Sequence, residues 1–411
     1  MIKFEKFTLG NGLKVIVHND PTTTIVAFNI LYNVGARDEN PQKTGFAHLF
    51  EHLMFEGSTN IQSFHKPLQL AGGESNAFTS NDITNYYITI AKENIETAFW
   101  LESDRMLGLD FSEEKLSVQK NVVIEEFNQR YLNQPYGDIH LLLRPLVYKK
   151  HPYSWPTIGK ETSHIENANL TEVKSFFDTY YAPNNAILSI VGNVSTKQIK
   201  DLAEKWFGQI KPVKNILRNF PLEPKQTEAR TLTVERDVPF DAIYKAFRMC
   251  DRLHNDYYTF DLISDLLANG KSSRLYQNLV IQQKLFSEIN AYISGSIHDG
   301  MFVISGKLIK GVTINDAEKA INQELSKIAY DDISEKEIEK VKNKFESVYL
   351  YGHINALNKA KDLAYYELVG DANFINSEVE KYRNVSLDDI RRVAQNAFNQ
   401  NNSSTVYYLA K

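Results

Sequence analysis

The sequence predicts an α+β fold made of two homologous domains, each with a mixed, mainly antiparallel sheet packed with helices. Three observations favour this class. Short apolar runs bounded by turn residues are typical of paired strands, capped amphipathic stretches are typical of helices, and the second half of the chain repeats the order of the first. The length of 411 residues allows two or three domains, and 43% apolar with 24% charged residues is ordinary for a folded protein.

The first half opens on a predicted hairpin. Asn11 and Gly12 form a turn between two apolar runs, and the second run alternates from Leu13 to His18. The further elements expected here are a strand at 24–34, a helix at 44–55, a hairpin at 75–91, helices at 95–106 and 113–132, and a buried strand at 186–191.

The second half is expected to repeat this plan. It supplies strands within 231–248, helices at 257–267 and 273–283, a hairpin at 288–308 and a last strand at 404–409. The helix starts at Ser334 and Leu387 resemble those at Ser112 and Leu170, with offsets of 334 − 112 = 222 and 387 − 170 = 217. Such offsets favour a duplication, although two α/β domains can share an element order by chance.

We therefore predict domains at 1–211 and 231–411, joined by a proline-containing, charged linker at 212–230. The net charge of −5 and the pI of about 6.1 give no reason to expect a nucleic-acid partner. The one cysteine, Cys250, cannot form an intramolecular disulfide. No apolar stretch is long enough to span a membrane, and the given N-terminus contains no signal or transit pattern, so a cytoplasmic location is expected.

The strongest chemical signal is an H-x-x-E-H motif at His48, Glu51 and His52. On a helix the two histidines are about 40° apart around the axis, so they share a face, with Glu51 at its edge. The surrounding positions are nearly all apolar, which predicts a buried helix. A divalent metal would satisfy these polar groups, whereas the alternative is a histidine pair bonded to neighbouring carbonyls.

A zinc ion needs a third protein ligand and an open position for water. The predicted helix at 113–132 carries two adjacent carboxylates, Glu125 and Glu126. Helical periodicity does not choose between them, and both could be solvated.

These motifs resemble those of the pitrilysin/insulinase family of inverted-motif (HxxEH) zinc metallopeptidases, in particular the short two-domain members related to mitochondrial processing peptidase. The similarity covers nearly the whole chain and is densest over 1–210. Besides the motif, it rests on the segments 76–79 (NAFT), 84–87 (TNYY), 151–153 (HPY) and 272–275 (SSRL).

The resemblance implies half of a clam-shell peptidase, with one Zn²⁺ per chain held by His48, His52 and Glu126. It gives Glu51 the role of general base toward the attacking water in a zinc-dependent endopeptidase that hydrolyses unfolded peptides. It also implies that Asn76, Ala77 and Phe78 form an edge strand that binds peptide substrates. The alternative for that strand is an ordinary hairpin with Phe78 in the core.

The chain departs from the family pattern at two places. Gln119 stands two turns before the third ligand, where relatives often carry a carboxylate. A glutamine there can still hydrogen-bond a ligand but adds no negative charge. Val280 and Ser287 stand where active members carry an oxyanion-stabilising Arg and Tyr. This predicts a partner, either a paralogous subunit that supplies the Arg/Tyr pair or a second copy of the chain in a homodimer.

Two rival functions remain open. A non-catalytic assembly subunit of the same fold is one, although such subunits lose zinc ligands and this chain keeps all of them. A metal-dependent hydrolase of another kind is the second, and it requires the match at residues 76–79 to be accidental.

Overall fold

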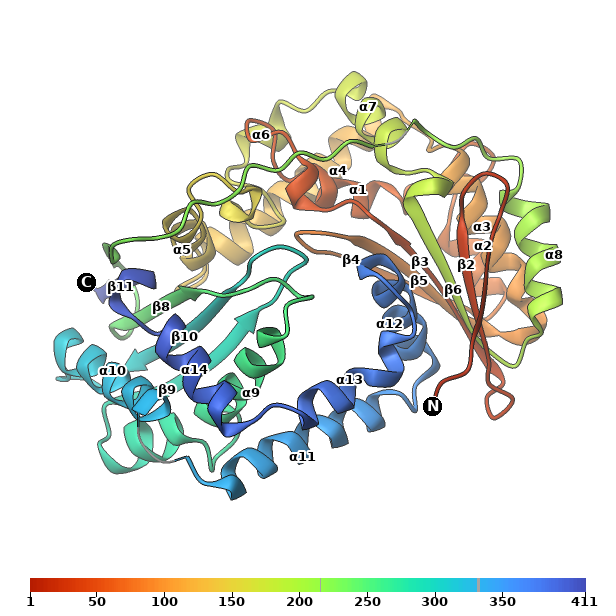
Figure 1. Cartoon of the computed structure of the whole chain (residues 1–411). Coiled ribbons are helices and arrows are strands. Elements are labelled where there is room, and N and C mark those ends of the chain that lie inside the picture. Colours follow the sequence, from red (N-terminus) through yellow and green to blue (C-terminus); the bar gives the residue numbers. More distant parts are fainter. Residues whose placement is uncertain (215, 331–332) are drawn as a thin grey trace. The chain divides into compact units, whose positions relative to one another are not determined.

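The structure is a computed structural model that describes residues 1–214, 216–330 and 333–411 (Figure 1). It contains two sheets, one in each half of the chain. Within these residues no helix is both long and apolar enough to cross a membrane. The chain divides into two compact units, each of which combines segments from both halves of the sequence.

The first sheet has the strand order β1-β2-β6-β3-β5-β4. Its strands are β1 (Glu5–Thr8), β2 (Lys14–Asn19), β3 (Ile25–Tyr32), β4 (Glu74–Thr79), β5 (Thr84–Ala91) and β6 (Ala186–Gly192). Only the β2–β6 pair is parallel. The central strands β3 and β6 are buried on both faces, which explains their nearly continuous apolar sequences.

The second sheet has the order β7-β11-β8-β10-β9. Its strands are β7 (Arg230–Arg236), β8 (Ala242–Arg248), β9 (Phe286–Ser294), β10 (Met301–Leu308) and β11 (Ser403–Ala410). Its parallel pair, β7–β11, corresponds to β2–β6, and its antiparallel pairs follow in the same sequence. Equivalent strands keep a constant offset, as in 242 − 25 = 217 for β8 and β3 and 403 − 186 = 217 for β11 and β6. The two sheets are therefore repeats of one plan, with β1 as an addition to the first.

Helices make up most of the rest of the chain. In the first half they are α1 (Phe46–Leu53), α2 (His65–Leu70), α3 (Ile95–Leu107), α4 (Glu113–Phe127), α5 (Ile139–Val147), α6 (Ser163–Glu166), α7 (Leu170–Tyr180) and α8 (Thr196–Phe207). In the second half they are α9 (Asp256–Ala268), α10 (Ile314–Tyr330), α11 (Glu335–Gly352), α12 (Ala356–Val369), α13 (Phe374–Arg383) and α14 (Leu387–Ala397). Two short segments are π-helical: η3 (Asn128–Leu132), directly after α4, and η6 (Tyr276–Gln282), before β9.

Each unit contains one complete α-helix from the opposite half of the sequence. In the first unit α12 packs against β3 and β6, while in the second unit α5 packs against β8 and β11. These helices are themselves equivalent, since 356 − 139 = 217. The predicted division into 1–211, 212–230 and 231–411 follows the two sheets, one in each half of the chain. Each compact unit, however, includes segments from both halves. The predicted domain boundaries therefore describe the sequence repeat and stay a prediction.

Most predicted elements lie within a few residues of their expected places. Among the described residues of 212–229 there is no helix or strand, as expected for a linker. The opening hairpin differs in its turn, because the Leu9 amide bonds to the Leu13 carbonyl and gives a longer connection than an Asn-Gly pair alone. The helix expected at 273–283 has π-type bonding over η6.

Candidate metal centre

Helix α1 carries the H-x-x-E-H motif, and its start is fixed by two residues before it. Gly45 has φ 92°, and a Cβ there would lie 2.7 Å from the Ile158 carbonyl oxygen, so only glycine fits. The buried Glu39 carboxylate accepts hydrogen bonds from the backbone amides of Gly45 and Ala47, both at 2.9 Å, and from the Trp155 indole at 3.0 Å. Burial raises the pKa of Glu39 to about 8.

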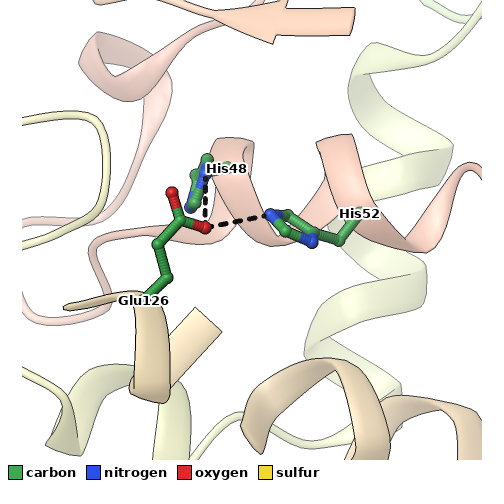
Figure 2. Close-up of side chains that lie close together, drawn as sticks. All are labelled: His48, His52 and Glu126. Carbon is green, nitrogen blue, oxygen red and sulfur yellow. Dashed lines mark ion pairs between the residues drawn. The ribbon is translucent and has the colours of Figure 1, made fainter. Parts of the chain in front are cut away.

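The two histidines of α1 meet Glu126 of α4, as Figure 2 shows. The Oε2 atom of Glu126 lies 3.7 Å from Nε2 of His48 and 3.4 Å from Nε2 of His52. One ligand atom from each residue lies within 4.8 Å of the others, and all three side chains are partly exposed. Among the residues that the structure describes, this is the one such group of three metal-ligating side chains.

The distances from the two imidazole nitrogens to the Glu126 oxygen are more typical of three ligands around a metal ion than of direct hydrogen bonds. Both nitrogen–oxygen distances exceed the usual 2.7–3.2 Å range of such a bond. Ligands bound to zinc at roughly 2.0–2.1 Å in a tetrahedron are about 3.3 Å apart, close to the observed 3.4 and 3.7 Å. Two imidazoles and one carboxylate also form a donor set typical of catalytic zinc sites, which keep a position open for water.

The structure separates the two carboxylates that helical periodicity left equivalent. Glu126 faces the histidines, whereas Glu125 is exposed. Gln119 lies on the buried face of α4, but its amide donates to Glu56 Oε1 at 2.6 Å. The expected hydrogen bond from Gln119 to a metal-ligand candidate is therefore replaced by one to the carboxylate of Glu56, just after α1.

Glu51 lies beside the cluster and is held by the edge strand. The Thr79 hydroxyl donates to Glu51 Oε2 at 2.6 Å. Burial raises the pKa of Glu51, while the hydrogen bond from Thr79 and the nearby His52 act in the opposite direction. A partly desolvated carboxylate next to two imidazoles and a third ligand can serve as a proton acceptor.

Strand β4 is an outer strand of the first sheet and pairs with β5 alone. Asn76 and Phe78 are exposed, Phe78 at 39%, and Ala77 is half-buried. The alternative that placed Phe78 in the core is wrong. The Ala77 amide donates to Asn76 Oδ1 at 2.8 Å, so the side chain of Asn76 covers an amide at the open edge.

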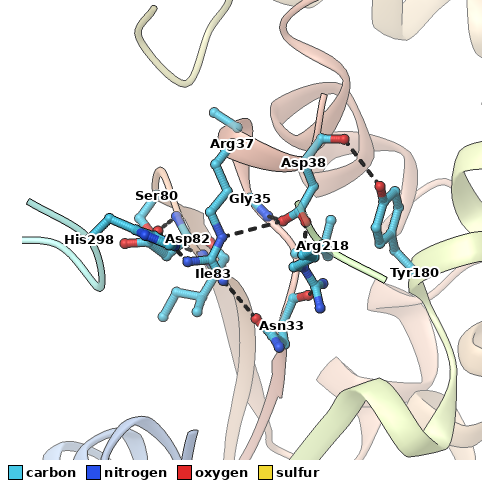
Figure 3. A network of polar contacts seen from close by, with 12 residues as sticks. Asn33, Gly35, Arg37, Asp38, Ser80, Asp82, Ile83, Tyr180, Arg218 and His298 are labelled. Carbon is cyan, nitrogen blue, oxygen red and sulfur yellow. Dashed lines mark hydrogen bonds and ion pairs between the residues drawn. The ribbon is translucent and has the colours of Figure 1, made fainter. Parts of the chain in front are cut away.

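The turn that joins β4 to β5 is anchored by a buried network (Figure 3). Arg37 donates to Asp82 at 2.8 Å, and the Ser80 hydroxyl accepts the amide of Asp82 at 3.1 Å. Arg218, from the predicted linker, donates to Asp38 at 2.6 Å. Because the Arg37–Asp82 ion pair is buried, it holds the turn at the end of β4 in a defined position, and the Arg218–Asp38 pair fixes the residue next to Arg37.

Val280 and Ser287 lie in the second unit. Val280 is on η6 and Ser287 is exposed on β9, where its hydroxyl donates to the Lys307 carbonyl at 3.2 Å. The isopropyl group of Val280 has no hydrogen-bond donor. The side chain of Ser287 is shorter than that of Arg or Tyr, and its hydroxyl is a weaker donor. The structure thus gives no reason to assign either side chain the oxyanion role.

Sequence reasoning missed two residues that shape this centre. Thr79 was part of the quoted NAFT segment but had no assigned contact, and the pairing of a strand hydroxyl with a helix carboxylate follows only from tertiary packing. For Glu39 the sequence offers only a weak indication of its role, namely an acidic residue shortly before the helix that carries the H-x-x-E-H motif.

Comparisons with known proteins agree with this architecture. The model of the insulinase family, peptidase family M16, matches residues 14–158, and a model described as the peptidase M16 inactive domain matches residues 167–345. The zinc protease PqqE of Helicobacter pylori is 31% identical over 411 residues, covering 98% of this chain and 92% of that protein.

Solved structures give the same result. The crystal structure of a protease from Helicobacter pylori superposes with a TM-score of 0.93 at 30% identity, over 99% of this chain and 100% of that one. The periplasmic protease PqqL from Escherichia coli shares the fold at a TM-score of 0.81 and 16% identity, and this chain matches 48% of it. With its family models, its sequence relative and its fold in agreement, the chain belongs to the insulinase family of peptidases, family M16.

Proposed function

We propose that this protein is a zinc-dependent endopeptidase that hydrolyses unfolded peptides, and that it is the zinc-bearing subunit of a two-chain enzyme. The observation that carries the proposal is the convergence of His48, His52 and Glu126, with Glu51 beside them. The names of relatives as zinc proteases support the same class of chemistry.

In this proposal His48, His52 and Glu126 hold one zinc ion per chain. Bound zinc would polarise the scissile carbonyl and lower the pKa of the attacking water toward neutrality. Glu51 accepts the proton of that water and passes it to the leaving amine. Glu51 is suited to this role by its place, since its carboxylate is partly buried beside the cluster and is held by the Thr79 hydroxyl.

The substrate is an extended peptide that adds to the open edge of β4. Main-chain hydrogen bonds tolerate varied side chains, and they require a segment that is not already folded. Ala77 offers its main chain at this edge, Asn76 offers a carboxamide beside it, and the exposed ring of Phe78 offers an apolar contact.

A partner subunit would complete the site. Val280 and Ser287 cannot replace an Arg and a Tyr as oxyanion donors, and PqqL is about twice the length of this chain, which matches 48% of it. The partner is either a paralogue that carries the Arg/Tyr pair or a second copy of this chain.

The test is a metal analysis combined with cleavage of a quenched, unstructured peptide. We expect about one zinc per chain and cleavage that a chelator abolishes and added zinc restores. Glu51→Gln should keep zinc and lose about 10²–10⁴-fold in kcat, whereas Glu125→Gln, on the exposed side of α4, should match the wild type. Cleavage by Glu51→Gln at the wild-type rate would show that the base is another residue.

The two-chain arrangement is tested by mixing the chain with a paralogue of similar length. An isolated chain that cleaves as fast as any mixture would contradict it. The second candidate function is a non-catalytic subunit of the same fold, favoured by the match of residues 167–345 to an inactive-domain model. Zinc binding without cleavage, alone or in any mixture, would support that alternative.

A further inference from the structure

The contact between Thr79 and Glu51 joins the peptide-binding edge to the catalytic helix. Thr79 is the last residue of β4, and its hydroxyl lies 2.6 Å from a carboxylate oxygen of Glu51 on α1. Both side chains are half-buried. A hydroxyl bonded to a carboxylate at this distance is a strong, charge-assisted hydrogen bond.

The orientation of β4 places this contact on the open edge. The Ala77 amide bonds to the Asn76 side chain, so it points away from β5. In an antiparallel strand the main-chain groups of alternate residues point to the same side. Those of Ser75, Ala77 and Thr79 therefore face the edge that a peptide would join, and Glu51 lies where that edge ends.

We propose that Thr79 is a positioning residue that holds the general base Glu51 in a fixed place relative to a peptide docked on β4. This inference rests on the proposed function and extends it. Thr79 lies two residues after Ala77 on β4, which corresponds to about 6.6–6.8 Å along the strand. A peptide paired with Ala77 would therefore reach Glu51 two residues further along. The hydrogen bond thus sets which peptide bond meets the base.

The surroundings of Thr79 make such a role physically reasonable. A β-branched side chain in a strand has few rotamers, so its hydroxyl position is well defined. The next residue, Ser80, begins the turn that the buried Arg37–Asp82 ion pair anchors. Glu51 is thereby fixed to a rigid element, as the geometry of proton transfer requires.

The experiment compares Thr79→Val, which keeps the shape and removes the hydroxyl, with Thr79→Ser, which keeps the hydroxyl. Thr89→Val on β5 is the matched control, since it makes the same change at a half-buried position of the neighbouring strand. Steady-state kinetics use the zinc-loaded chain, with its partner if one is needed. The second measurement is thermal unfolding of the zinc-free chain for Thr79→Val, Glu51→Gln and the double variant.

We expect Thr79→Val to lower kcat about 10- to 100-fold with zinc content unchanged and KM within about threefold. Thr79→Ser should recover most of the loss, and Thr89→Val should match the wild type. In the zinc-free chain the two single changes should lower the unfolding temperature by amounts that sum to more than the shift of the double variant.

A Thr79→Val enzyme with wild-type kcat, a Thr79→Ser enzyme as slow as Thr79→Val, or additive unfolding shifts would each overturn the inference while leaving the proposed function intact. A wild-type chain that binds zinc but cleaves no peptide, alone or in a mixture, would instead overturn the proposed function and the positioning role together.

Discussion

The Nε2 atom of His52 lies 3.4 Å from the Oε2 atom of Glu126, although 126 − 52 = 74 positions separate the two residues. The adjacent residue, Glu125, is exposed, whereas Glu126 is partly buried. The two residues form a matched pair for testing which glutamate serves as a ligand, because they share a helix and a carboxylate group and differ in exposure.

Glu126→Gln should lower zinc affinity by more than about 100-fold, the upper range for loss of an outer-shell partner. Glu125→Gln should bind zinc as the wild type does. Competition with a chromophoric chelator measures both. Equal affinities in the two variants would remove Glu126 from the ligand set.

Gly45→Ala should destabilise the chain by about 1–3 kcal/mol, because alanine meets the Ile158 carbonyl and resists a φ of 92°. Since α1 begins at this residue, zinc uptake should fall with the unfolding temperature. Gly10→Ala is the control, with no atom near the added Cβ and an expected change within about 0.5 kcal/mol. An unaltered unfolding temperature in Gly45→Ala would contradict the close packing before α1.

Ala77→Pro should weaken binding of an unstructured peptide about 2- to 10-fold by removing one outward amide donor. The fold should survive, because an edge strand tolerates proline where the amide faces away from its neighbour. Fluorescence anisotropy with a labelled peptide and the Glu51→Gln background gives the dissociation constant without cleavage. Ala77→Ser keeps the amide and serves as the reference, and equal constants for the two would argue against docking at this edge.

The ion pair between Asp20 and Lys359 should make the free energy of unfolding depend on pH in the acidic range. The Lys359 ammonium, 2.5 Å away, and the Thr22 hydroxyl lower the pKa of Asp20 from 3.8 to about 2. A carboxyl group with a lowered pKa stabilises the folded state above pH 3.8, and this contribution is lost as the pH falls through about 2.

Asp20→Asn should therefore lower the free energy of unfolding near neutral pH by on the order of 1–2 kcal/mol. The difference from the wild type should shrink as the pH falls from about 4 to 2, which denaturant titrations at several pH values can follow. Glu93→Gln, at an exposed ion pair, is the control. A difference that stayed constant over this range would show that the pKa of Asp20 is not lowered in the folded chain.

Much of the fold could be predicted because its elements carry local signals. The apolar run of β2, the caps Ser112 and Ser386 and the two buried runs at 186–191 and 404–409 each follow from neighbouring residues, although Ile16 is buried and so interrupts the alternation expected in β2. The sequence analysis predicts no helix over α2, α5, α6, α8, α10, α12 and α13. Local signals are nevertheless present for α8 and α12, because the side chains of Ser195 and Asn355 cap their first turns.

The sequence by itself determined the repeat, the helix that carries His48, Glu51 and His52, and the two candidate glutamates, because spacing along one helix decides which side chains share a face. Tertiary structure alone decided that Glu126 reaches the histidines, that Gln119 bonds to Glu56, that Thr79 holds Glu51, and that α5 and α12 each pack in the unit of the opposite half. These contacts join residues from separate elements, and packing between elements follows from shape and burial rather than from periodicity.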